Sequence, residues 1–171
     1  MSATSPYLEI ALKSERYAAL EAGWRAMLDG ERDPVLIMST VACELHHAFE
    51  YFDWTGFYRV IRPELLAVGP YQGGHGCLYI PFDKGVCGAC ARSGETQWVR
   101  DVHQRDDHIA CSSTTLSEVV VPIVRQSDQK LVAVLDIDSD QLDVFEHDDI
   151  TGLTKIAFLI GHLWESSESL P

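Results

Sequence analysis

The sequence predicts an α+β domain in which helices pack on a central, mainly antiparallel sheet. Apolar residues recur at helical spacing near both ends of the chain, whereas in its middle the spacing changes to two, the period of a strand. Several expected strands are joined by short connections, which makes antiparallel pairing the most economical arrangement. The expected order is two helices, two strands, a mixed segment with a short helix, two strands and a closing helix.

Two helices are expected before the first strand. A Ser-Pro start signal and a glycine stop predict an amphipathic N-terminal helix over about residues 5–30. Asp33 begins a second helix, whose apolar positions continue at spacings of four and three as far as Phe52. Cys43 falls within this second helix, where a free cysteine usually behaves as a small apolar residue, so we expect an inert buried thiol.

The rest of the chain is expected to form the sheet and two further helices. Strands are predicted at 54–61, 65–69, 77–80, 96–99, 117–124 and 131–138, and helices at 85–92 and from about 146 onward. Residues 100–115 show no periodicity and are rich in Asp, His and Ser. Long loops of this kind are often functional, so we expect this one to border a site.

Length and charge limit the classes of function. The 171 residues suit one domain with a full core, and 13 basic against 26 acidic residues give a net charge of −13. This charge repels phosphate backbones and anionic lipids, which disfavours nucleic-acid and membrane partners. The sequence has no apolar leader and no apolar run near the ~20 residues that span a bilayer, so a cytoplasmic location is expected.

Four of the five cysteines lie between Cys77 and Cys111, and without a secretion signal they suggest reduced thiols, a metal site or catalysis. Cys87 is expected at the start of a short helix, a position that favours the thiolate. Together with Cys90 it also has the form of a dithiol redox motif. A zinc site built from all four is disfavoured, because paired Cys-x-x-Cys elements are lacking, and no metal is expected. The third alternative is a pair in which one cysteine is a nucleophile and a second cysteine resolves the sulfenic acid that forms on it.

Two further groups of residues could bind a substrate. On the first expected strand, Trp54 and Tyr58 share a face with Gly56 between them, which leaves a slot for a small apolar group. The alternative is two core aromatics around a packing glycine. Asp136 and Asp138 leave one face of a later strand, and Glu118 lies in the neighbouring strand candidate.

Carboxyl groups in apolar strands cost free energy unless they are paired or used, and burial and like charge both raise their pKa. Glu118, Asp136 and Asp138 could therefore hold a proton for a leaving oxygen. For Asp138 alone, a cap at the strand end is the alternative.

Seven short motifs of this sequence resemble those of a known family. They are Trp54-Thr55-Gly56-Phe57-Tyr58, Gly69-Pro70-Tyr71-Gln72-Gly73, Gly85-Val86-Cys87-Gly88, Asp101-Val102-His103, His108-Ile109-Ala110-Cys111, Ser117-Glu118-Val119-Val120-Val121-Pro122 and Val134-Leu135-Asp136-Ile137-Asp138-Ser139. The sequence resembles free methionine-(R)-sulfoxide reductases, which are single GAF domains, from about Ser5 to the closing helix. The resemblance implies one GAF domain over residues 1–171 and a homodimer.

The resemblance also implies roles for individual residues. Cys111 matches the cysteine that attacks the sulfoxide, Cys77 the main resolving cysteine and Cys87 an auxiliary cysteine. Two departures are Ser112, where the family usually has Asp, and Cys90, a possible auxiliary thiol where a small residue is usual. The substrate-binding side chains implied are Glu118, Asp136, Asp138, Trp54 and Tyr58.

The function implied by the resemblance is thiol-dependent reduction of free L-methionine-(R)-sulfoxide to L-methionine, without a cofactor. The reaction would pass through a sulfenic acid on Cys111 and an intramolecular disulfide with Cys77, and thioredoxin or a similar dithiol would restore the thiols. The alternative is a non-catalytic GAF module that senses a small ligand or the redox state.

Overall fold

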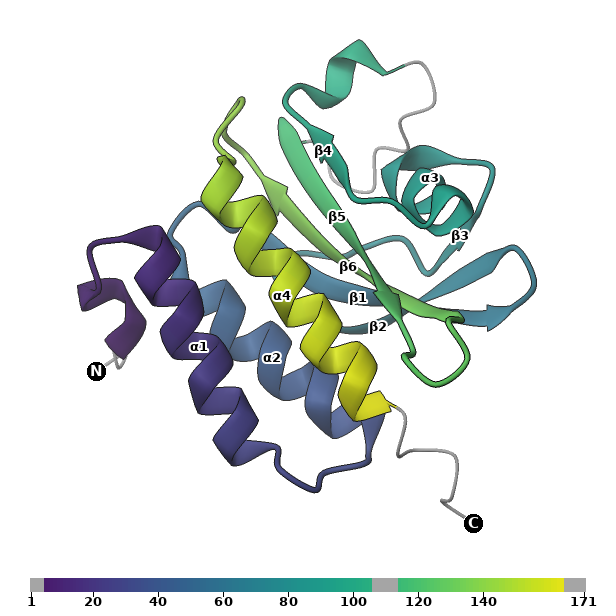
Figure 1. The fold of residues 1–171 in the computed structure, drawn as a ribbon. Helices are drawn as coiled ribbons and strands as arrows, with labels where there is room; N and C mark the ends of the chain where they lie inside the picture. Colours follow the sequence, from purple (N-terminus) through teal and green to yellow (C-terminus); the bar gives the residue numbers. More distant parts are fainter. Residues whose placement is uncertain (1–4, 106–113, 165–171) are drawn as a thin grey trace.

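The structure, a computed structural model, describes residues 5–105 and 114–164. Within these residues the strands form one antiparallel sheet in the order β3-β2-β1-β6-β5-β4 (Figure 1). The strands are β1 (Trp54–Arg62), β2 (Leu65–Gln72), β3 (Tyr79–Pro81), β4 (Gln97–Val99), β5 (Ser117–Val124) and β6 (Leu131–Ser139). The predicted α+β fold with a mainly antiparallel sheet is therefore confirmed.

Helices cover both faces of this sheet, unequally. On one face lie α1 (Lys13–Met27), α2 (Pro34–Ala48) and α4 (His147–Leu163), side by side in Figure 1. On the other face lies the short α3 (Gly85–Ser93). Two 3₁₀ turns, η1 (Pro6–Glu9) and η2 (Val102–Gln104), complete the described elements.

The alternation of side chains along the strands separates two apolar clusters. On β1, Phe57 packs into the larger cluster beneath α1, α2 and α4, whereas Trp54 and Tyr58 belong to the smaller cluster beneath α3. The same alternation holds on β5, where Val119 faces the larger cluster and Val120 the smaller. The three-helix face therefore forms the main core, and the α3 face is the one that carries the polar residues of interest.

The N-terminal segment differs from the single helix predicted over about residues 5–30. The turn η1 ends at Glu9, the backbone of Ile10 that follows is extended, and α1 begins only at Lys13. The guanidinium of Arg16 donates to the carbonyl oxygen of Ile10 at 2.6 Å and to that of Ala48 at 2.9 Å. The Arg16 guanidinium therefore takes the place of the helical N–H group that would bind the Ile10 carbonyl oxygen if the helix were continuous.

The second helix is also shorter than its apolar pattern predicts. It ends at Ala48, and Phe49 has an extended backbone although its ring is buried. Cys43, expected to be buried, is instead a free and exposed thiol. The reason is geometric, because Cys43 lies about 100° around the helix from Ala42, which does belong to the buried face.

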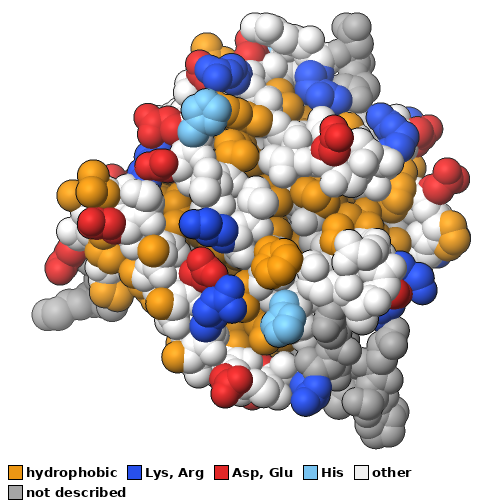
Figure 2. Space-filling model, in the orientation of Figure 1, with side chains coloured by type: hydrophobic (Ala, Val, Ile, Leu, Met, Phe, Trp, Pro, Cys, Tyr) orange, Lys and Arg blue, Asp and Glu red, His pale blue; other side chains and the backbone are white. Residues whose placement is uncertain are grey.

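Charged and apolar side chains are interspersed on the outer surface. In Figure 2, basic and acidic side chains alternate across the face that carries α1 and α4, and apolar side chains lie among them. Phe158 of α4 is 57% exposed. None of the described helices is long and apolar enough to cross a membrane.

A buried carboxylate joins the N-terminal and C-terminal helices. Asp149, in the first turn of α4, accepts hydrogen bonds from the hydroxyl of Tyr17 at 2.9 Å and from the hydroxyl of Tyr51. Its other oxygen accepts from Lys13 Nζ at 3.0 Å and from the backbone N–H of Glu146 at 2.7 Å. Because four donors converge on it, the buried Asp149 carboxyl group has its hydrogen-bonding capacity satisfied and anchors α1 to α4.

Asp149→Ala is expected to lower the free energy of unfolding by about 3 kcal/mol, because it leaves the Lys13 ammonium and two tyrosine hydroxyls without their acceptor. Asp148→Ala, at the exposed neighbouring position, should change it by less than about 1 kcal/mol. Urea denaturation followed by circular dichroism measures both. Equal effects of the two substitutions would contradict the anchoring role.

Candidate functional site

The central strand β6 carries two carboxyl groups on the α3 face of the sheet. Asp138 pairs in register with Trp54 on β1 and with Glu118 on β5. Asp136, two residues earlier, pairs with Gly56 on β1. Residues that are directly opposite on neighbouring strands point to the same face. The structure therefore brings together the carboxylates and the aromatic strand that the sequence analysis selected separately.

Helix α3 approaches this row of carboxyl groups closely. A side chain at Gly88 would place its Cβ 2.6 Å from the carbonyl oxygen of Pro81, too close for any residue but glycine. Gly85, the first residue of the helix, has a φ of +67°, a backbone conformation that glycine adopts at little cost. These two glycines allow α3 to lie against the end of β3 and direct Cys87 toward the sheet.

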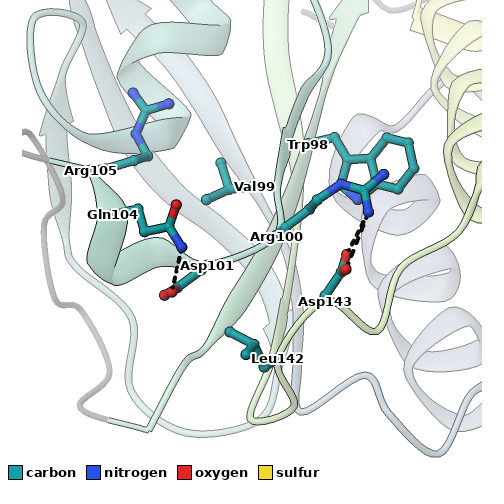
Figure 3. Close-up of a pocket in the computed structure, with 8 residues that line it drawn as sticks. All are labelled: Trp98, Val99, Arg100, Asp101, Gln104, Arg105, Leu142 and Asp143. Atoms are coloured by element: carbon teal, nitrogen blue, oxygen red, sulfur yellow. Dashed lines mark hydrogen bonds and ion pairs between the residues drawn. The ribbon is translucent and has the colours of Figure 1, made fainter.

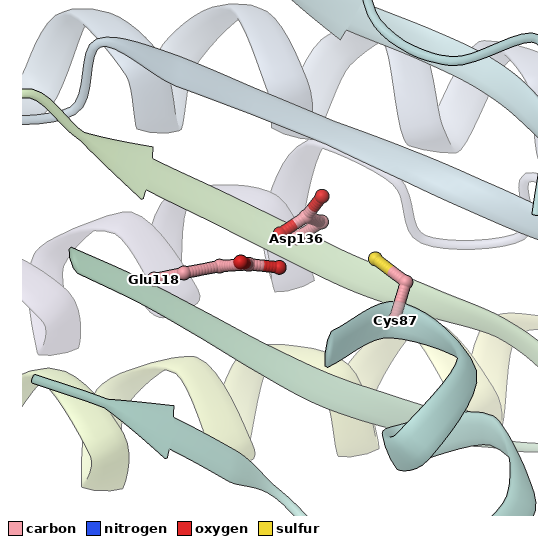
Figure 4. A group of neighbouring side chains, drawn as sticks. All are labelled: Cys87, Glu118 and Asp136. Carbon is pink, nitrogen blue, oxygen red and sulfur yellow. The ribbon is translucent and has the colours of Figure 1, made fainter. Parts of the chain in front are cut away.

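Cys87, Glu118 and Asp136 converge beneath α3 (Figure 4). The Sγ atom and one oxygen of each carboxyl group lie within 4.8 Å of one another, and all three residues are buried. The Oδ1 atom of Asp136 has no hydrogen-bond partner in the described structure. An unpartnered buried carboxyl oxygen is costly, which indicates that this cluster accommodates a positively charged or hydrogen-donating ligand.

Burial keeps all three carboxyl groups protonated to unusually high pH. It raises the pKa of Asp136 to about 7, although hydrogen bonds from Cys87 and Glu118 oppose the shift. Burial, followed by the charges of Asp136 and Asp138, raises the pKa of Glu118 well above its usual range, and the positive charge of Arg105 acts in the opposite direction. The pKa of Asp138 is likewise raised, first by burial and then by Asp136.

The two thiols of α3 are not activated by their place in the helix. Cys87 occupies the first turn, where a lowered pKa is expected, but burial and the neighbouring Asp136 and Glu118 raise its pKa well above the usual value. Burial also raises the pKa of Cys90, which is fully buried. The expected thiolate at Cys87 is therefore wrong for this structure, because desolvation and negative charge outweigh the helix terminus.

The aromatic residues of β1 form a continuous stack rather than an open slot. The rings of Trp54 and Tyr58 are 5.7 Å apart between centroids and inclined by 22°, and Tyr71 of β2 stacks on Trp54 at 5.3 Å. A Cβ at Gly56 would lie 2.5 Å from the Trp54 ring, so the ring folds over the glycine. The gap expected between two parallel side chains is closed for this reason, and the stack presents an apolar surface beside the carboxyl groups.

Cys77 is held against the same stack. Its backbone forms a hydrogen bond with the Tyr58 hydroxyl, and Trp54 Nε1 donates to the carbonyl oxygen of Gly74 at 3.1 Å. Cys77 is half-buried and disulfide-bonded, whereas the described cysteines Cys43, Cys87 and Cys90 are free. Cys111, the predicted nucleophile, lies outside the described residues, as does Ser112.

A polar pocket of about 500 Å³ lies at the end of β4 (Figure 3). Arg100 pairs with Asp143 at 3.1 Å and lies over the Trp98 ring, while Arg105 points away from this pair. Among the residues that the structure describes, none of the predicted site residues lines the pocket. It borders the site through Val99, which pairs in register with Glu118, and through Arg105, whose positive charge acts on Glu118. The lining residues are Trp98, Val99, Arg100, Asp101, Gln104, Arg105, Leu142 and Asp143.

Comparison with known proteins agrees with this architecture. The family model described as GAF domain matches residues 33–163. This chain belongs to the GAF domain family. Among related GAF proteins, the free methionine-R-sulfoxide reductase of Escherichia coli is 34% identical over 84% of this chain and 86% of its own length. The enzyme of the same name from Saccharomyces cerevisiae is 38% identical over 86% and 85% of the two chains.

A solved GAF structure extends the likeness to three dimensions. The free methionine-R-sulfoxide reductase of Neisseria meningitidis, in complex with its substrate, superposes with a TM-score of 0.86 at 37% identity and covers 93% of this chain and 94% of that one. The resemblance drawn from the sequence motifs is thus confirmed.

Two residues near the site were not singled out from the sequence. Tyr71 completes the aromatic stack, and it lies within one of the motifs that carry the family resemblance. Arg105 places a positive charge near Glu118, and it lies in a stretch without periodicity, so that no pattern indicated its position. Tyr71 acts through its contact with Trp54, and Arg105 through its charge near Glu118, and both effects arise only when separate segments of the chain meet in the fold.

Asp136→Asn is expected to raise the free energy of unfolding, relative to the wild type at the same pH, by more at pH 8 than at pH 5. In the unfolded chain Asp136 loses its proton near pH 3.8, but in the folded protein it keeps it up to about pH 7. The stability that this carboxyl contributes is therefore complete below pH 3.8 and is lost as the pH rises to 7, with an upper limit of about 4 kcal/mol.

Because the amide does not titrate, the gain in free energy of unfolding over the wild type should be larger at pH 8 than at pH 5 by roughly 2 kcal/mol. Urea denaturation at the two pH values measures this difference. Glu95→Gln, at an exposed position, serves as the control and should show no such pH dependence. A gain for Asp136→Asn that is the same at both pH values would contradict the prediction.

Proposed function

We propose that this protein reduces free L-methionine-(R)-sulfoxide to L-methionine, with Cys111 as the nucleophile. The observation that carries the proposal is a row of carboxyl groups, with Glu118 and Asp136 buried and Asp138 half-buried, set beside an aromatic stack. Such a row can bind an ammonium group and donate a proton, the two tasks that an amino-acid sulfoxide requires. The names and substrate complex of its GAF relatives support the same substrate.

The substrate would be oriented by its two ends. Its ammonium group binds the unpartnered Oδ1 of Asp136, because this buried oxygen otherwise lacks a donor. Its methyl group lies against the stacked rings of Trp54 and Tyr58, which supply an apolar surface. In this orientation the sulfoxide lies between the carboxyl groups and the cysteines.

Glu118 is the proposed proton donor. The substrate's ammonium lowers the pKa of Asp136 and keeps it ionised, whereas burial and the neighbouring carboxyl groups raise the pKa of Glu118 well above its usual range and favour its protonated form. A neutral acid beside a fixed anion provides both binding and protonation in one cluster.

The sulfur chemistry follows in three steps. The Cys111 thiolate attacks the sulfoxide sulfur while Glu118 protonates the oxygen. The resulting hydroxyl group then transfers to the Cys111 sulfur as the bond between the two sulfur atoms breaks, so methionine departs and Cys111 is left as a sulfenic acid. The thiol of Cys77 then attacks this sulfur and releases water, which leaves a Cys111–Cys77 disulfide. An external dithiol, thioredoxin in this proposal, takes the disulfide and restores both thiols.

The properties of the other cysteines support this assignment. Cys87 and Cys90 are buried, with raised pKa values, so that neither is a ready thiolate near neutral pH, and exposed Cys43 lies on the opposite face of the sheet. Cys77 is disulfide-bonded, as a resolving cysteine is in the oxidised form. Cys87 is assigned the auxiliary role. A cytoplasmic homodimer completes the proposal.

Reduction of each sulfoxide epimer tests the proposed activity. With dithiothreitol as reductant, methionine should be released from the free (R)-sulfoxide, whereas the (S) epimer and a peptide that contains the (R)-sulfoxide should be inert, because the ammonium group that Asp136 binds is an amide within a peptide. Methionine is quantified by chromatography. Binding of the (R) epimer without any release would instead support a sensing GAF module.

Single-turnover measurements separate the roles of the cysteines. Cys111→Ser should release no methionine, because a hydroxyl is a far poorer nucleophile than a thiolate. Cys77→Ser should release about one equivalent on first mixing and then recycle slowly with thioredoxin, since attack precedes disulfide formation. Cys43→Ser, at an exposed site distant from the carboxyl row, is the matched control and should behave as wild type. Release of a full equivalent by Cys111→Ser, together with none by Cys87→Ser, would transfer the nucleophile to Cys87.

A further inference from the structure

A thiol and two carboxyl groups meet at the base of the site, a set of donors that the proposed reduction uses only in part. We infer that Cys87, Glu118 and Asp136 form a binding site for a thiophilic divalent cation such as Zn²⁺, which inhibits the protein by occupying the place of the substrate's ammonium group. The metal site itself follows from the geometry of these residues, and only the inhibition rests on the proposed function.

The spacing of the donors suits one metal ion. The three ligand atoms lie within 4.8 Å of one another. With bonds of about 2.3 Å to sulfur and about 2.0–2.2 Å to oxygen, a shared zinc ion requires separations of roughly 3.5 Å, so small side-chain rotations bring the atoms into place. Three protein ligands leave a fourth position for water, as in open zinc sites.

The surroundings favour a cation at this position. The Oδ1 atom of Asp136 is buried and unpartnered, and Figure 4 shows the Glu118 carboxyl and the Cys87 sulfur directed toward the same region. Asp138 adds a further carboxyl group on the same face, directly opposite Glu118 on the neighbouring strand. A cation that contacts these acids satisfies the orphaned oxygen and removes the repulsion between the carboxylates.

The donor types select among metals. A thiolate ligand favours Zn²⁺ or Cd²⁺ over Mg²⁺ and Ca²⁺, which prefer a shell made of oxygen atoms. This set also differs from a site of four cysteines, because Cys77 is disulfide-bonded and Cys90 does not belong to the cluster. The proposed metal site is therefore formed where α3 packs against strands β5 and β6.

Binding exchanges protons for the metal. The metal displaces the proton of the Cys87 thiol and any proton that the two carboxyl groups share, so that apparent affinity rises with pH. No redox change at the metal is involved. When the ion is removed by a chelator, the protons return and the site accepts substrate again.

Cadmium titration of the disulfide-bonded protein tests the site. In this form the described free thiols are Cys43, Cys87 and Cys90. Cys43→Ser protein, which lacks the exposed thiol, should bind about one equivalent of Cd²⁺ and develop the ultraviolet absorption band of a cadmium–thiolate bond. Adding Cys87→Ser should abolish the band, whereas adding Cys90→Ser, a matched change on the same helix, should leave it in place.

Glu118→Gln provides a nearly isosteric second test. It should weaken Cd²⁺ binding at least about tenfold, because even residues outside direct contact with a metal are typically worth 10–100-fold. Circular dichroism spectra and thermal unfolding of each variant verify that the fold is kept. Absence of the band in Cys43→Ser protein, or its persistence after Cys87→Ser is added, would overturn the inference.

Inhibition is measured separately in a single turnover of reduced, desalted protein, since excess dithiol would remove the metal. Stoichiometric Zn²⁺ should suppress methionine release by at least about tenfold, and EDTA should restore it. Cd²⁺ binding combined with unaffected release would refute the inhibition. A protein that releases no methionine even without metal would instead refute the proposed reductase activity, and the metal site would stand on the cadmium measurements.

Discussion

The burial of carboxyl groups on the central strand is the constraint on which the rest of the site depends. Asp136 and Asp138 lie in β6, with β1 on one side and β5 on the other, so water reaches them only from the α3 face. Helix α3 covers that face closely enough to bury Asp136 and Glu118. Burial of charge is unfavourable, and the protein responds by holding protons on these groups, which is the property that a general acid needs.

The remaining fold supports this unfavourable arrangement. The large apolar cluster under α1, α2 and α4 lies on the opposite face of the same strands, and Asp149 ties the first and last of these helices together. Stability is therefore concentrated on one side of the sheet and the titratable groups on the other. This separation allows a strand such as β6 to carry two acids without loss of the fold, because Ala133, Leu135 and Ile137 on its other face belong to the large apolar cluster.

In the proposed reaction and the proposed metal site, the same cluster accepts three kinds of positive group: a proton, an ammonium and a divalent metal. The proton remains on Glu118 because burial and neighbouring acids disfavour its anion. The ammonium and the metal compete for Asp136, whose free oxygen lacks a partner. Cys87 distinguishes the metal from the ammonium group, because its sulfur adds little to the binding of an ammonium group but binds zinc strongly. Thiol neighbours of a catalytic carboxyl group thus create sensitivity to thiophilic metals.

Local periodicity in the sequence was sufficient to place Trp54 and Tyr58 on one face of a strand, and Asp136 and Asp138 on one face of another, because the side-chain alternation of a strand depends only on its own backbone. That these two faces and Glu118 lie on the same side of the sheet follows from the strand register, which only the structure shows. The tertiary structure determined the positions of the rings and the pKa values, which periodicity cannot predict. The Trp54 ring closes over Gly56, and Cys87 has a raised rather than a lowered pKa. Ring positions and pKa values depend on the atoms that surround a group, and here those atoms come from strands and helices distant in the chain.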